Sequence, residues 1–211
     1  RVLMIDAGPA PESTTFVALE EIRRQLLAEQ VSSELVYIGA QPVSDCHFCG
    51  GCRQSGRCVQ RDCLNPILER AEQADAYIFA CQSHYGAING RLAMLVHRFA
   101  RGLLVTCRRS GATSALAQLN SYFSMSSMPI VSSTYWHVLV GSTPDLARQD
   151  QEGLRTMRNL ARSMAWLLKS IESGRQSGLA PLQPESGKRK EPFMNQQTVV
   201  LAGAGTMGTS L

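Results

Sequence analysis

The sequence lacks a long apolar run, a strong charge of one sign and any leader-like segment. None of its apolar stretches approaches the length of about eighteen residues that a membrane-spanning helix needs, so we expect no membrane span. The formal net charge of +4 is small and spread along the chain, which gives no reason to expect nucleic acid as a partner. Arg1–Ile5 already has the pattern of a buried strand, so we expect no signal peptide and infer that a few residues, including the initiator methionine, are missing before it.

What is present is enough for one well-packed α/β domain and a tail, because the chain has 211 residues, 44% of them hydrophobic. Cysteine is the unusual component. Without a secretory signal, clustered cysteines indicate metal or redox chemistry rather than a disulfide scaffold, and they favour the cytoplasm. Five cysteines fall in one short window, and two follow later: Cys46, Cys49, Cys52, Cys58 and Cys63, then Cys81 and Cys107.

Apolar runs with the pattern of strands alternate along the chain with amphipathic helical runs. The predicted strands are Val2–Ile5, Ser33–Ile38, Ala76–Cys81, Leu103–Cys107 and Met128–Ser132. The predicted helices are Phe16–Glu29, Asn65–Gln73, Gly90–Arg101, Ser114–Ser124 and Leu146–Ser173. This alternation predicts a doubly wound, parallel five-stranded α/β sheet with helices on both faces. Ligands of such sheets bind at the carboxyl ends of the strands, where the predicted loops are Ala7–Thr15, Gln82–Asn89 and Arg108–Thr113.

The predicted domain covers residues 1–173 and includes a cysteine-rich insertion at 45–63. Residues 174–197 are polar and rich in Pro, Gly and Ser, which is typical of a mobile linker with a solvated basic triplet at Lys188–Lys190. The connection at Gly102–Leu103 is very tight for a helix followed by a strand. Either the loop is unusually short, or residues are absent from the sequence at this point.

The apolar, Gly-rich tail, residues 198–211, contains a strand-like run followed by Gly203-x-Gly205-x-x-Gly208, which is similar to the opening of a dinucleotide site. A complete site needs a helix, a second strand and an acidic residue about twenty positions further on. The motif is therefore a coincidence, a segment that packs on a partner, or the start of another domain, and we assign it no NAD binding.

The first loop offers hydroxyl groups where a helix begins. Ser13, Thr14 and Thr15 could hold a phosphate together with the N–H groups of the helix N-terminus. The alternative is that Ser13 or Thr14 simply caps the helix.

The cysteine pattern is more specific. Cys46-x2-Cys49-x2-Cys52-x5-Cys58 places four thiols close together in sequence, and Gly50-Gly51 lets the backbone fold around an object. This compact spacing suits a [4Fe–4S] cluster better than zinc, whose sites usually pair two such clips across a longer spacer. Buried free cysteines or a redox-labile group of thiols are the alternatives. Cys63 receives no role.

Several stretches of the chain, taken in order, resemble the iron–sulfur flavoprotein and NAD(P)H-dependent FMN reductase branch of the flavodoxin-like proteins. The resemblance covers roughly residues 1 to 170, and the cysteine spacing and Tyr135-Trp136 are its specific parts. The similar stretches are the opening strand with Gly8–Thr15, Cys46–Cys52 with Gly56–Cys58, Ala74–Ile78, His84–Leu92, Arg108–Thr113 with Leu119–Phe123, and Met128–Trp136.

The resemblance implies an FMN site built from three loops, with NAD(P)H as co-substrate and the chemistry at the flavin N5, so that no side chain needs to be catalytic. It also implies a homodimer or tetramer, with a redox partner protein as a further possibility. The implied flavin contacts are Gly8, Ser13, Thr14 and Thr15 for the phosphate, Cys81, Gln82, Ser83, His84, Tyr85 and Gly86 along the ring, and Arg109, Ser110, Gly111 and Thr113 on its other side. His84 and Tyr85 would stack on the flavin or lie along its edge, and Tyr135 and Trp136 would pack at an interface or beneath it. The isolated His47, His97 and His137 are expected to be structural.

The chain also departs from the family pattern. Gly8, Ala10 and Pro11 stand where relatives carry a serine and a basic residue, so a charge-assisted phosphate contact of about 1.5–3 kcal/mol is lost. Other replacements are Thr14 for Asn, Cys81-Gln82 for Ser-Pro, Ala93 for Lys and His97 for Asp. Three functions therefore remain open: a flavin oxidoreductase using NAD(P)H, an electron carrier with FMN and a cluster, and a non-catalytic or FMN-poor accessory subunit.

Overall fold

The computed structural model describes most of the chain: residues 1–55, 57–85, 87–99, 114–117, 119–120, 128–180 and 199–200. At its centre is a parallel sheet in the order β2-β1-β3, made of β1 (Val2–Asp6), β2 (Ser33–Tyr37) and β3 (Ala76–Ala80). Every residue of β1 and β3 is buried, because helices cover both faces of the sheet, and this explains why both strands are continuously apolar apart from Asp6.

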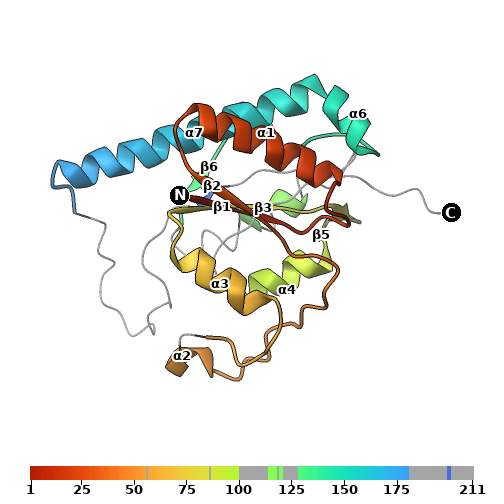
Figure 1. Cartoon of the computed structure of the whole chain (residues 1–211), viewed down its shortest axis with the longest axis vertical. Helices are drawn as coiled ribbons and strands as arrows, with labels where there is room; N and C mark the ends of the chain where they lie inside the picture. Colours follow the sequence, from red (N-terminus) through yellow and green to blue (C-terminus); the bar gives the residue numbers. More distant parts are fainter. Residues whose placement is uncertain are drawn as a thin grey trace.

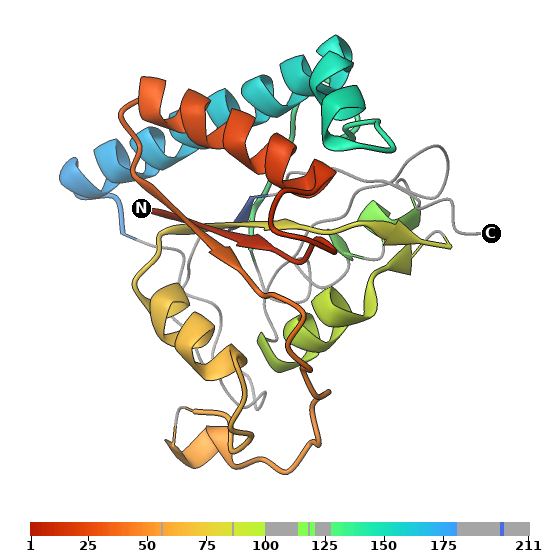
Figure 2. The ribbon, with the colours of Figure 1, turned by 45° about the vertical axis from the view of Figure 1, so that its right-hand side comes forward.

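Helices lie on both faces of the sheet, as the alternation in the sequence predicts (Figure 1). One layer contains α1 (Thr14–Ala28), α6 (Pro144–Gln149) and α7 (Gln151–Gln176). The opposite layer contains α3 (Leu64–Glu72) and α4 (Gly90–Phe99), and the turned view separates the two layers clearly (Figure 2). The doubly wound arrangement places the loops after β1 and β3 at one edge of the sheet.

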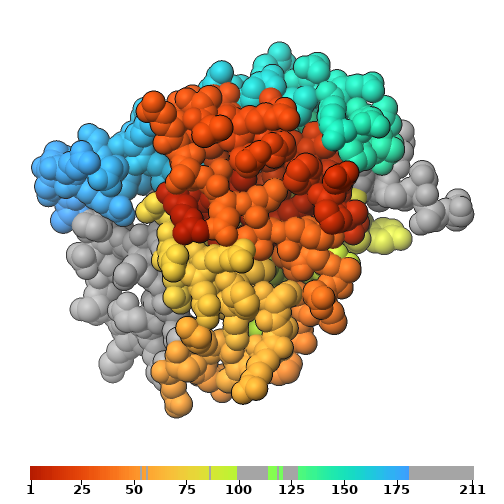
Figure 3. Space-filling model, in the orientation of Figure 1, coloured from red at the N-terminus to blue at the C-terminus, as the bar shows by residue number. Residues whose placement is uncertain are grey.

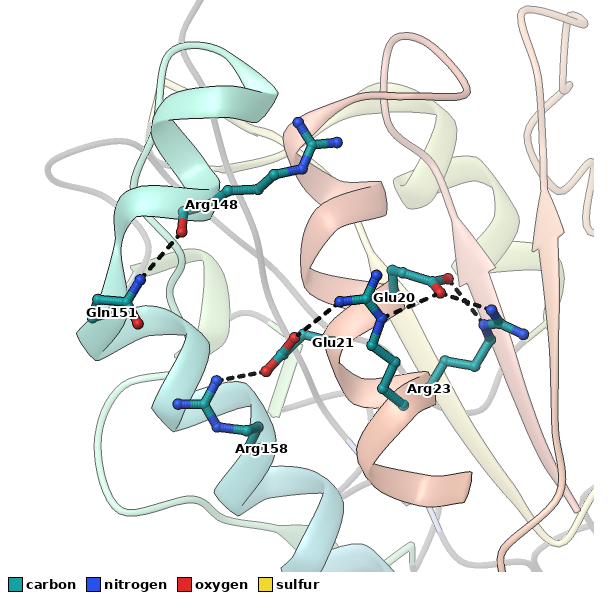
Figure 4. Close-up of polar contacts among 7 residues, drawn as sticks. Glu20, Glu21, Arg23, Arg148, Gln151 and Arg158 are labelled. Atoms are coloured by element: carbon teal, nitrogen blue, oxygen red, sulfur yellow. Dashed lines mark hydrogen bonds and ion pairs between the residues drawn. The ribbon is translucent and has the colours of Figure 1, made fainter. Parts of the chain in front are cut away.

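Helices α1 and α7 are joined by packing and by charge (Figure 4). Arg158 Nη1 of α7 donates to Glu21 Oε1 of α1 at 2.5 Å, and within α1 both Arg23 and Arg24 pair with Glu20. The exposed ion pairs are worth little individually. The long α7 is therefore held mainly by its buried apolar stripe, which includes Leu160.

The long predicted helix at Leu146–Ser173 is two helices. Pro144 begins α6 at a Thr143 cap, and Asp150 then caps α7 by accepting a hydrogen bond from the Gly153 N–H at 2.9 Å. This inserted cap ends the first helix, so the prediction of one continuous helix is wrong.

The remaining strands are short. Two of them, β4 (Ser83–His84) and β5 (Ala87–Ile88), form an antiparallel hairpin that the sequence pattern does not predict. Elsewhere β6 (Ile130–Val131), shorter than the predicted Met128–Ser132, pairs in parallel with β7 (Val199–Val200).

Parts of the predicted fold lie outside the described residues. These are the strand Leu103–Cys107, part of the helix Ser114–Ser124, the linker beyond residue 180 and the glycine motif of the tail. Within the described part of the chain, no helix is both long and apolar enough to cross a membrane.

Candidate functional site

The loop between β1 and α1 closes around one small volume beside Gly8. A Cβ atom added to Gly8 would lie 2.1 Å from Thr15 Oγ1 and 2.4 Å from Ser13 Oγ, so a side chain here would have to displace these two hydroxyl groups. The two hydroxyl oxygens are themselves 2.5 Å apart, and both residues are buried. The loop thus gathers hydroxyl groups at the N-terminus of a fifteen-residue helix.

Ser13 does not act as a side-chain cap. It stands at the N-cap position of α1 with extended backbone angles, but its hydroxyl bonds to Thr15 rather than to the first turn of the helix. The alternative of simple capping by Ser13 is therefore wrong. The hydroxyls and the N-terminus of α1 fit a phosphate group in their donor chemistry.

A carboxylate lies where β1 enters this loop. Asp6, the last residue of β1, is 1% exposed, and its Oδ1 accepts a hydrogen bond from the Gly8 N–H at 2.7 Å. Burial raises the pKa of Asp6 to about 6, although hydrogen bonds from Thr15 and Gly8 act to lower it. Its Oδ2 is buried without a hydrogen-bond partner among the described residues. A negative group at this point does not suit a phosphate, so the loop fits FMN in its hydroxyl groups but not in its charge.

In the loop after β3, the first residues are buried and the later ones are exposed to solvent. Cys81, Gln82 and Ser83 are buried, whereas His84 and Tyr85 are exposed, and Tyr85 has a positive φ of 50°. Two aromatic side chains at the carboxyl end of the sheet are thus free to contact a planar ligand. Their stacking on a flavin stays a prediction, and Gly86 lies outside the described residues.

Two further residues, not predicted from the sequence, connect this loop to the first. Asn89 Nδ2 donates to the Ala7 carbonyl at 2.7 Å, and its Oδ1 accepts from the Leu92 N–H at 2.9 Å. Arg91 Nη1 lies 3.5 Å from the Gly8 carbonyl oxygen. Asn89 ties the start of α4 to the first loop, and Arg91 brings a cation to a loop that has none of its own. The third predicted loop, with Arg109, Ser110, Gly111 and Thr113, lies outside the described residues.

The cysteine segment, residues 45–63, lies far from α7, on the side of the sheet covered by α3 and α4 (Figures 1 and 3). Its described residues include one short helix, α2 (Cys52–Ser55). Cys46 and Cys58 are half-buried, Cys49 and Cys52 are exposed, and all four are free. Among the described residues no three metal-ligating side chains come together, so the segment in this arrangement does not fit a metal cluster.

The end of α4 fastens both ends of this segment. His97 Nδ1 lies 2.8 Å from Asp45 Oδ1, and Arg98 donates to the Ser44 carbonyl at 3.2 Å and forms an ion pair with Asp62. The Arg98 side chain is 1% exposed. Its guanidinium also interacts with the Cys58 sulfur. His97 therefore has the structural role expected of it, and Arg98 was not predicted.

The thiol of Cys63 has a lowered tendency to ionise. Burial and the neighbouring Asp62 both raise the pKa of its thiol, which keeps it protonated at neutral pH.

A third feature is a pocket of about 490 Å³ beside β6. His137 is buried there, and its Nε2 accepts a hydrogen bond from the Ser133 N–H at 3.0 Å. Burial lowers the pKa of His137 to about 4, so it is neutral at physiological pH and structural. Tyr135 and Trp136 lie at the pocket with more than half of their surface exposed.

Comparison with known proteins relates this arrangement to flavoproteins. The profile of the NADPH-dependent FMN reductase family matches residues 1–141. An iron–sulfur flavoprotein of Methanocaldococcus jannaschii is 25% identical over 192 residues, which are 82% of this chain and 99% of that protein. An iron–sulfur flavoprotein of Methanosarcina thermophila is 23% identical over 161 residues, or 68% of this chain and 82% of that protein.

Solved structures confirm the fold. The Trp repressor binding protein from Bacillus subtilis matches 75% of this chain and 98% of its own, with a TM-score of 0.54 at 15% identity. A WrbA-like flavodoxin from Agrobacterium tumefaciens matches 80% of this chain and 97% of its own, with a TM-score of 0.54 at 12% identity. The expected flavodoxin-like α/β fold is therefore confirmed.

Proposed function

Because the chain belongs to the NADPH-dependent FMN reductase family, we propose that it is a flavin oxidoreductase that takes electrons from NAD(P)H and passes them through FMN to a small acceptor. One observation carries the proposal: the hydroxyls of Ser13 and Thr15 converge beside Gly8 at the N-terminus of α1. This loop lies at the sheet edge where ligands of doubly wound folds bind.

The residues of the chain have positioning roles in this function. The hydroxyl groups of Ser13 and Thr15 and the N–H groups at the N-terminus of α1 would lie against the tail of the flavin, and Asn89 holds the two loops together through the Ala7 carbonyl. The buried part of the second loop would exclude water on one side, while His84 and Tyr85 would contact the ring. The flavin, when bound, supplies the hydride chemistry, so no acid or base in the chain is required.

The absorbance spectrum of anaerobically purified protein tests this function first. We expect bands near about 370 and 450 nm, as oxidised flavin gives. Stopped-flow mixing with NADH or with NADPH would then bleach the longer-wavelength band. A flavin that neither nicotinamide reduces would contradict the enzyme and leave the electron carrier.

A second proposal is a [4Fe–4S] cluster on Cys46, Cys49, Cys52 and Cys58. Its support is the compact spacing together with the relatives called iron–sulfur flavoproteins. Because these cysteines are apart in the structure, ligation would require the segment to close. Iron and sulfide analysis tests it: Cys49→Ser should lose the iron, and Cys63→Ser should keep it. Equal iron content in both variants, or none in the unmodified protein, would contradict the cluster.

A third proposal, the FMN-poor accessory subunit, is favoured by a different observation. No Lys, Arg or His occurs between Val2 and Ile22, and the buried Asp6 lies in the same stretch. A colourless protein that stays colourless with excess FMN would support this function over the other two. For all three functions we propose the cytoplasm, since free cysteines persist in a reducing compartment.

A further inference from the structure

The first loop already holds a negative group at the point where an anion would bind. The position of a Cβ on Gly8 lies 2.9 Å from Asp6 Oδ1 and 2.4 Å from Ser13 Oγ. The carboxylate and the hydroxyl therefore border the same small volume. Asp6 Oδ1 also takes the Gly8 N–H, which is one of the donors that a phosphate would otherwise use.

The free oxygen of Asp6 requires a particular kind of ligand atom. Oδ2 is buried and has no partner among the described residues. An ionised carboxylate only accepts hydrogen bonds, and the oxygens of a phosphate dianion also only accept. A hydroxyl group can donate, so Asp6 Oδ2 suits a ligand hydroxyl and not a phosphate oxygen.

The charge balance of the loop agrees with this. The loop and the end of β1 before it carry two carboxylates, buried Asp6 and exposed Glu12, and no cation. Arg91 reaches it from α4, but bonds to the Gly8 carbonyl rather than to Asp6. One guanidinium against two carboxylates leaves the loop negative before any ligand arrives.

We propose that Asp6 is a specificity-determining residue that selects against the phosphate of the flavin, so that this chain binds riboflavin at least as tightly as FMN. The flavin hydroxyl at the end of the ribityl chain donates to Asp6 Oδ2, where a phosphate would meet a carboxylate. This selection rests on the proposed flavin-binding function.

Fluorescence titration of the flavin-free full chain with riboflavin and with FMN at neutral pH tests the proposal. In the unmodified protein the Kd for riboflavin should equal or lie below that for FMN. Asp6→Asn keeps the shape but adds an N–H donor, and it should lower the Kd for FMN by about tenfold relative to riboflavin. Glu12→Gln, the matched control in the same loop, should change this ratio less than about threefold because Glu12 is exposed.

Arg91→Gln provides a second test variant, at a residue that lies outside the sheet. It should raise the Kd for FMN and leave that for riboflavin unchanged, since it removes the one cation that reaches the loop from α4. Circular dichroism of each variant establishes that it is folded.

Each remaining outcome decides against the proposal. Unmodified protein that binds FMN more tightly than riboflavin overturns it even if Asp6→Asn does not fold. An Asp6→Asn variant that tightens both flavins equally, or neither, overturns it while leaving the flavin function intact. Absence of binding of either flavin to the unmodified protein and to Asp6→Asn overturns the proposed function as well.

Discussion

At the scale of single residues, Asp6 is the one carboxylic acid that is buried among the residues the structure describes. Its pKa of about 6, raised from 3.8 by burial, makes it a determinant of stability as well as of binding. The protonated form is the one that the folded state favours. Its contribution is complete below pH 3.8 and is lost as the pH rises through 6.

Asp6→Asn should remove this dependence. Relative to the variant, the unmodified protein should lose about 2 kcal/mol of unfolding free energy between pH 4 and pH 7, since each pKa unit corresponds to about 1.4 kcal/mol. Urea denaturation of both proteins across this range measures the difference. Parallel curves would show that Asp6 titrates normally in the folded protein.

The sequence predicts only some of the residues that form the candidate site. Ser13 and Thr15 could be predicted because hydroxyls before a helix have a local meaning. The contacts of Asn89 with Ala7 and of Arg91 with Gly8 join positions more than eighty residues apart, and no local pattern carries that information. The sequence pattern places Asp6 just after the predicted strand Val2–Ile5, and only its burial in the structure shows its effect.

At the scale of elements, the last turn of α4 holds the two ends of the cysteine segment in place. The Arg98 side chain is buried, bonds to Ser44 and Asp62 at the two ends of the segment, and interacts with Cys58. Removing a partner from a buried ion pair leaves the other charge uncompensated, which costs more than an exposed pair does.

Arg98→Gln should therefore loosen the segment without unfolding the sheet. We expect alkylation of Cys58 by iodoacetamide to become about tenfold faster, because local opening needs less free energy. Mass spectrometry of the labelled peptide measures the rate. Arg57→Gln is the control, since Arg57 pairs with Glu69 at 2.9 Å at the surface. Equal rates in the two variants would contradict the anchoring role of Arg98.

Helices and strands with a continuous hydrophobic pattern could be predicted from the sequence. Element boundaries set by a single capping residue or a short turn could not. The strands β1 and β3 are buried on both faces, so their apolar runs are unbroken apart from Asp6. The hairpin of β4 and β5 has only two residues in each strand, too few to show a period. The break between α6 and α7 depends on Asp150, which stands inside an otherwise amphipathic run.

At the scale of the whole molecule, apolar side chains gather on the segment that follows β6. Tyr135 is 61% exposed and Trp136 54%, and Ile130 and Val140 are exposed nearby. Exposed aromatic groups of this kind mark interaction surfaces. We propose that a second copy of the chain covers them.

Light scattering after gel filtration should show a dimer or a tetramer, and Trp136→Glu should shift it to the monomer. The other tryptophan, Trp166, is 70% exposed on α7 and supplies the control. Trp166→Glu should leave the assembly unchanged. A monomeric unmodified protein, or an assembly broken only by the control, would contradict this interface.

The cysteine segment leaves and rejoins the fold at nearly one point, because Ser44 and Asp62 both bond to Arg98. When the two ends of a loop are fixed close together, making the loop longer costs little additional chain entropy. The sheet and its ligand loops can therefore be inherited with a longer, shorter or altogether different insert. The segment that carries the cysteines could therefore change in evolution while every strand of the sheet stays the same.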